Sequence, residues 1–137
     1  MRRSRLGENR RTARSGAAVA ELAICLPLFV LLVLASIEAC SMIFLNHGLT
    51  IASYEGVRAA INYDAANSDV TARCNAIITQ REIADASVST SPSNVASVPR
   101  GEPITVTVSA PCDPNMLIPP WFYGGRTLVA TTTMVKE

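Results

Sequence analysis

The order of apolar and polar residues divides the chain into a long helical part and a smaller part with strands. Residues 17–45 are almost all apolar, with two acids, Glu21 and Glu38, and no base. Pro27 is the only strong helix breaker before residue 64, and a proline inside a membrane helix usually kinks the helix rather than ending it. The pattern therefore predicts one long helix over residues 17–64.

Beyond residue 64 the pattern becomes mixed. An apolar stripe over residues 70–84 predicts a second helix, which Ser68 or Asp69 can cap. Alternating β-branched and hydroxyl side chains predict strands in residues 103–110 and 127–135, and residues 87–103 predict a short strand and a loop. We expect an α+β fold in which a long N-terminal helix extends into a small head, where this second helix packs on a two- to three-stranded antiparallel sheet.

The apolar segment is long enough to cross a membrane, since about 20 helical residues span the hydrocarbon core. A buried helix of a soluble domain is a poor alternative, because the rest of the chain is too short to cover it. A cleaved secretory signal is also disfavoured, because no convincing A-x-A site follows the segment. We therefore expect a retained membrane anchor.

The formal net charge of +1 conceals an uneven distribution. Residues 1–15 carry six arginines and one acid, whereas residues 16–137 carry six basic and ten acidic side chains. By the positive-inside rule, the arginines place the N-terminus in the cytoplasm and the C-terminus outside it. We expect a basic cytoplasmic leader (residues 1–16, of which residues 1–15 are disordered in isolation), a transmembrane and extended helix (residues 17–64) and a periplasmic head (residues 65–137).

Small residues recur every four positions beyond the apolar segment and form a small-residue ridge of Gly48, Ala52, Gly56 and Ala60. Such spacing lets another helix approach closely. The same face can pack on the chain's own domain, and both contacts can occur at different turns. Glu38 falls near this ridge, where it can meet a donor on a partner helix or extend to the outer membrane interface.

The four cysteines fall into two pairs. Cys25 and Cys40 lie in the apolar segment and are expected to be ordinary membrane-helix residues. Cys74 and Cys112 lie in the part expected outside the cytoplasm, where two thiols in one small domain favour a disulfide. A zinc site needs about four ligands, and His47 is the only histidine, so no metal or cofactor is expected.

Motifs for catalysis are missing from the sequence, which has no G-x-S-x-G, no H-E-x-x-H and no glycine-rich phosphate loop. The near-neutral charge disfavours a nucleic-acid partner. The aromatic triplet of residues 121–123 can form a substrate platform, but a loop that covers a small core or touches the membrane is the better interpretation. We do not expect an enzyme.

The start of the apolar segment has the pattern of a processed leader. Gly16 follows the basic residues, Ala17 comes next, and Glu21 lies five residues after the glycine. Prepilin peptidases cut this arrangement after the glycine, which leaves Ala17 at the new N-terminus. An acid in an apolar span is a functional-site hypothesis, because it can pair with the freed ammonium of a neighbouring subunit.

Four further features occur together in the first half of the chain: an R-x-G-A-x-x-x-E opening at residues 14–21, L-P-L-F at 26–29, I-E at 37–38, and E-G-x-R-A-A at 55–60. With these features, residues 15–61 and the preceding Arg14 resemble the TadE-like family of the tight-adherence (Flp) pilus system. The last strand, which leads to Met-Val-Lys-Glu, also looks typical of the family.

The resemblance implies a pseudopilin-like subunit of the bacterial inner membrane that helps to assemble or initiate Flp pili and can itself enter the pilus. The implied partners are other pilin-like subunits, the pilus assembly platform and a prepilin peptidase. The main alternative is an unprocessed single-span scaffold protein of a secretion or pilus complex. A third is an enzymatic or ligand-binding head on an anchor.

Overall fold

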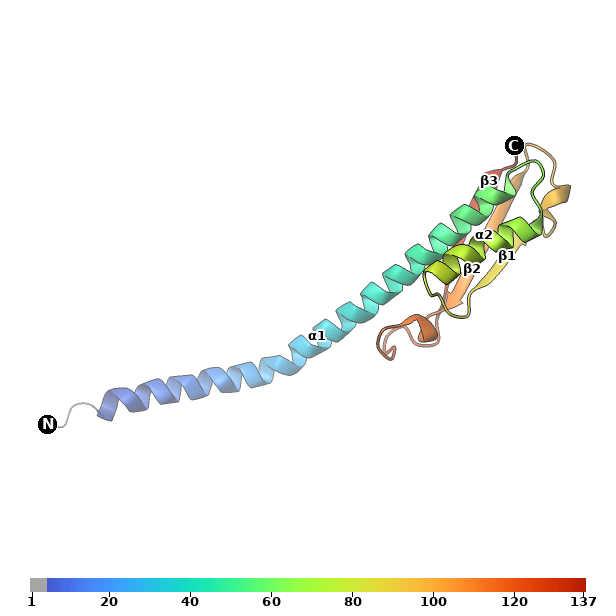
Figure 1. The fold of residues 1–137 in the computed structure, drawn as a ribbon. Helices are drawn as coiled ribbons and strands as arrows, with labels where there is room; N and C mark the ends of the chain where they lie inside the picture. The colour runs from blue at the N-terminus through green and yellow to red at the C-terminus, as the bar shows by residue number, and fades with distance from the viewer. Residues whose placement is uncertain (1–4) are drawn as a thin grey trace. The chain divides into compact units, whose positions relative to one another are not determined.

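The computed structural model describes the backbone of residues 5–137 and the side chains of residues 16–137. These residues form two α-helices, three strands and two short 3-10 helices (Figure 1). The chain divides into two compact units, of which the first ends at Ser36 and the second comprises Ile37–Glu137. We call the second unit the head.

The predicted long helix is present as α1 (Arg5–Ala60), with Pro27 inside it. It begins within the basic segment that the sequence predicts to be disordered, because arginine, leucine and glutamate favour helix and extend the helix of the apolar segment backwards. It ends a few residues earlier than predicted, where the N–H of Ala65 bonds the carbonyl of Asn62 in a turn at 3.1 Å.

The second helix, α2 (Asn67–Gln80), begins and ends earlier than the predicted range. The Asp69 carboxylate accepts the backbone N–H of Ala66 at 3.0 Å and so satisfies an amide just before the first turn. The helix stops because Glu82 takes a positive φ of 53°, which a right-handed helix cannot accommodate.

The strands are β1 (Ser87–Ser91), β2 (Pro103–Pro111) and β3 (Thr127–Val135). They form one antiparallel sheet in the order β1-β2-β3, in which Val108 lies opposite both Val88 and Ala130. The two 3-10 helices, Val95–Ser97 and Asp113–Asn115, lie in the connections before and after β2. The predicted α+β fold is confirmed, with three strands.

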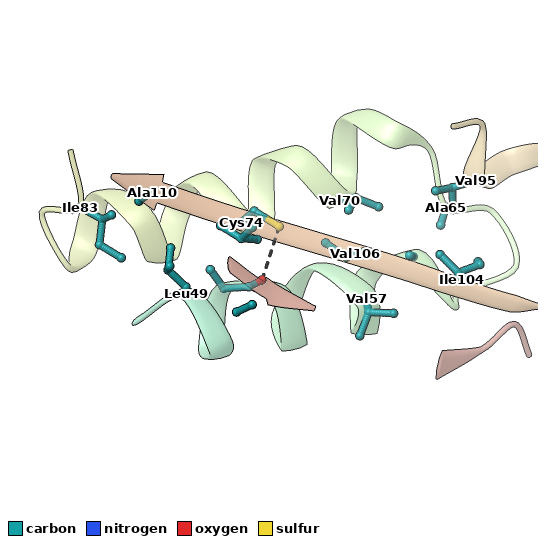
Figure 2. Packing of buried hydrophobic residues seen from close by; sticks show 14 of the residues in the cluster. Leu49, Val57, Ala65, Val70, Cys74, Ile83, Val95, Ile104, Val106 and Ala110 are labelled. Atoms are coloured by element: carbon teal, nitrogen blue, oxygen red, sulfur yellow. Dashed lines mark hydrogen bonds between the residues drawn. The ribbon is translucent and has the colours of Figure 1, made fainter. Parts of the chain in front are cut away.

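Alternation along β2 separates the two faces of the sheet. Ile104, Val106, Val108 and Ala110 are buried, and Figure 2 shows their face of β2 meeting side chains of the second part of α1 and of α2. The opposite face carries hydroxyl groups that pair across strands, such as Thr105 with Thr133 at 2.8 Å. The core of the head therefore lies between this sheet and the two helices.

Candidate membrane span and helix interface

The first part of α1 is apolar and exposed along its whole length. From residue 17 to residue 36 nearly every side chain is exposed, including Leu22, Phe29 and Leu32. At 1.5 Å per residue this stretch is ~30 Å long, which is the thickness of the hydrocarbon core. The helix is long and apolar enough to cross a membrane, which agrees with a single span.

The predicted leader-processing residues, Gly16, Ala17 and Glu21, all lie exposed on α1. A Cβ added to Gly16 would have no atom within 4 Å, so packing within the chain does not require glycine there. The basic side chains of residues 1–15 lie outside the described side chains. Processing at this site therefore stays a prediction.

Glu38 is buried, with 2% of its surface exposed. Its Oε1 atom accepts the backbone N–H groups of Trp121, Phe122 and Tyr123 at 3.0, 2.8 and 2.8 Å. Three converging N–H groups form a concave site for an anionic oxygen and offset the cost of burying it. The donors belong to the same chain, so the Glu38 carboxylate meets this loop instead of a donor on a partner helix, and it does not extend into solvent.

Two polar side chains fix the rest of the connection between β2 and β3. Both carboxylate oxygens of Asp113 accept the Gly125 N–H at 3.1 Å. The Asn115 side chain accepts the Ala84 N–H at 2.8 Å and donates to the carbonyls of Ala84 and Pro111 at 3.0 and 2.8 Å. The sequence does not predict these anchors, because the only local signal is the presence of two polar residues, Asp113 and Asn115, among prolines.

The aromatic loop, which we define as residues 116–123, presents three large apolar side chains outward. Leu117, Trp121 and Phe122 are 81%, 73% and 61% exposed. The centres of the Trp121 and Phe122 rings lie 5.9 Å apart. The aromatic triplet therefore does not cover the core of the head. Contact with a membrane or with a partner remains as the interpretation of this loop.

The small-residue ridge is buried against the chain's own head. A Cβ added to Gly48 would lie 2.8 Å from the Cδ1 atom of Ile83, and one added to Gly56 would overlap the Sγ atom of Cys74. Ala52 and Ala60 are fully buried. Of the two alternatives that the sequence leaves open, the structure shows the close approach to the chain's own α2 and β2 (Figure 2).

The predicted disulfide is not found, since Cys74 and Cys112 are both free and buried. Cys74 and Val106 both contact the position of Gly56, and the Cys74 thiol donates to the Ala52 carbonyl at 3.4 Å. Cys112 comes six residues after Val106, about 20 Å further along an extended strand. The two thiols therefore lie at different positions along the head. The expectation of a disulfide rested on an oxidising compartment, which says nothing about the distance between two cysteines.

Burial also keeps both thiols protonated. It raises the pKa of Cys74 from 9.0 to about 11, against a smaller lowering by a backbone hydrogen bond. Burial raises the pKa of Cys112, the neighbouring Asp113 carboxylate raises it further, and Arg126 lowers it. Protonated, buried thiols are poor nucleophiles, so these two cysteines act as small apolar core residues.

Comparison with known proteins finds one family match. Residues 16–58 match the family model described as TadE-like protein. The match confirms the resemblance found in the sequence, and it covers the exposed apolar stretch together with most of the part of α1 that the head buries. The chain matches no curated protein and no solved structure.

Proposed function

Because the chain is TadE-like over residues 16–58, we propose that it is a minor pilin-like membrane subunit for the assembly or initiation of tight-adherence (Flp) pili. The observation that carries the proposal is the division of α1 into an exposed apolar part and a part buried in a small α+β head. A subunit built in this way acts by lateral association of its helix, not by catalysis.

The proposed arrangement follows the charge distribution. Residues 1–16 form a cytoplasmic leader, residues 17–64 cross the inner membrane and continue into the periplasm, and residues 65–137 complete the head. The arginines of the leader favour this orientation by the positive-inside rule.

In this proposal a prepilin peptidase removes the leader after Gly16. The new ammonium group of Ala17 then pairs with Glu21 of a neighbouring subunit, because an acid in an apolar span is costly without a partner. The exposure of Gly16, Ala17 and Glu21 supports both steps.

Since the small-residue ridge is buried within the head, we place the contact with neighbouring helices on the exposed apolar stretch of residues 17–36. Other pilin-like subunits and the membrane-embedded assembly platform present apolar helices of the same kind. Association along this stretch is driven by packing and by pairing of the acid.

The intact mass of the protein extracted from membranes tests the proposal. We expect loss of residues 1–16 in cells that contain the peptidase, and a full-length product after deletion of the peptidase or in the Gly16→Ala variant. Gly16→Ala does not disturb packing, since no atom lies within 4 Å of the added Cβ. Gly7→Ala, a second glycine change in the leader, is the matched control and should be processed normally. A full-length product in wild-type cells would instead support the unprocessed scaffold.

A further inference from the structure

The aromatic loop is an apolar surface patch whose backbone is fixed by hydrogen bonds to the rest of the head. Its eight residues, MLIPPWFY, contain no charged side chain. Its backbone is fixed by the three hydrogen bonds to Glu38 and, on either side, by Asn115 and Asp113. Leu117, Trp121 and Phe122 nevertheless stay more than half exposed. Exposure of three large apolar side chains on an anchored backbone indicates that something outside the chain covers them.

The attachment point fixes the level of this patch along α1. Glu38 follows Ser36, the last residue of the exposed apolar stretch, by two positions, or about 3 Å of helix. When residues 17–36 fill the hydrocarbon core, Glu38 lies at its boundary. The loop that Glu38 holds then lies at the same boundary, where tryptophan and tyrosine are enriched in membrane proteins.

The neighbouring surface of the head has the composition expected beside lipid headgroups. Ile43 and Phe44 of α1 are exposed. The Arg81 guanidinium lies 5.7 Å from the centre of the Phe44 ring, and the Arg126 guanidinium lies 5.6 Å from that of Tyr123. Arginines stacked on aromatic rings at this level suit the lipid phosphates, while the rings suit the acyl boundary.

A cavity of about 600 Å3 opens on the same end of the head. Cys40, Phe44, Leu117 and Arg81 are among its lining residues. Its lining combines apolar side chains with polar ones, among them the Arg81 guanidinium and the Glu82 carboxylate, and Leu117 connects it to the aromatic loop.

We propose that the aromatic loop is a membrane-interface anchor: Leu117, Trp121 and Phe122 insert into the headgroup and upper acyl region of the phospholipid leaflet that adjoins the head. Glu38 positions the loop by binding its backbone. The inference rests on the crossing of a membrane by α1 and does not depend on a role in pilus assembly.

Trp121 is the only tryptophan of the chain, so its fluorescence reports on the loop directly. The full chain is reconstituted at low protein-to-lipid ratio in phosphatidylethanolamine–phosphatidylglycerol vesicles. We expect emission at shorter wavelength than in the unfolded chain, weak quenching by aqueous acrylamide, and strong quenching by lipids brominated close to the headgroup. Strong acrylamide quenching without quenching by brominated lipid would overturn the proposal.

A matched control moves the reporter to the other end of the head. Tyr63 is 75% exposed and lies beyond the C-terminal end of α1. In a Trp121→Phe/Tyr63→Trp variant we expect acrylamide quenching and no quenching by brominated lipid. Protection of Trp121 that appears only at high protein-to-lipid ratio would assign the patch to a neighbouring subunit and also overturn the proposal. None of these results depends on whether the leader is cleaved.

Discussion

The Oε1 atom of Glu38 accepts the backbone N–H of Phe122 at 2.8 Å, although the two residues are 84 positions apart. This hydrogen bond, with its two neighbours from Trp121 and Tyr123, joins the first turn of the head to the connection between β2 and β3. An acid that reads in the sequence as a membrane-buried partner site is thus an internal support of the fold.

Removal of the Glu38 carboxylate should release the aromatic loop. Glu38→Ala leaves three N–H groups without their acceptor, and a buried donor left unpaired costs about 1–3 kcal/mol. We expect a lower unfolding free energy in detergent and faster hydrogen exchange at the amides of residues 121–123.

Glu38→Gln is the control for this experiment, because glutamine has a side chain of the same length and its amide oxygen can still accept a hydrogen bond. It should lie between wild type and Glu38→Ala in both measurements. Unchanged exchange at residues 121–123 in Glu38→Ala would show that the loop does not depend on this carboxylate.

Gly56 should be intolerant of even the smallest side chain. An added Cβ would overlap the Sγ atom of Cys74 and lie 3.2 Å from the Cγ1 atom of Val106. Overpacking of this kind typically costs about 1–3 kcal/mol, so Gly56→Ala should lower the melting temperature of the head. A larger change such as Gly56→Leu would disrupt the head itself and cannot test a partner helix.

A double-mutant cycle identifies the cause. In Gly56→Ala/Cys74→Ala the overlapping sulfur is gone, and the combined loss of stability should be smaller than the sum of the two single losses. Strictly additive losses would mean that Cys74 does not set the limit at Gly56. Gly16→Ala, which meets nothing within 4 Å, should leave the melting temperature unchanged.

The elements that could be predicted from the sequence are those with local signals. Residues 127–135 are rich in β-branched side chains and form β3 with the predicted bounds, and the apolar stretch forms the long helix. The end of α2 was not predictable, because the apolar stripe continues to Ile83, whereas the helix ends at Gln80, before the positive φ of Glu82. The contact of Glu38 with its loop, and the separation of Cys74 in α2 from Cys112 after β2, were not predictable either, since no periodicity connects such distant positions.

Asn115 should contribute more to the stability of the head than is usual for a loop residue. Its amide makes three hydrogen bonds that join the end of β2 to the connection after α2. Asn115→Ala leaves the N–H of Ala84 and two carbonyls unpaired, so we expect a loss of about 1–3 kcal/mol in chemical unfolding. Asn94→Ala, which removes only the local cap of the 3-10 helix Val95–Ser97, is the comparison and should cost less. Equal losses would contradict a special role for Asn115.

The buried thiol of Cys74 should make the head less stable in alkali. Its pKa is about 11 in the folded chain, against 9.0 for an unperturbed thiol. Between these values the folded state keeps a proton that the unfolded state has lost, so the stabilisation is complete below pH 9 and disappears as the pH rises through 11. Because other groups titrate in this range, the measurement is the difference in unfolding free energy between wild type and Cys74→Ala, under reducing conditions, as a function of pH. We expect this difference to shift against wild type from pH 9 upward. A difference that stays constant with pH would show that Cys74 ionises as readily in the folded chain as in the unfolded one.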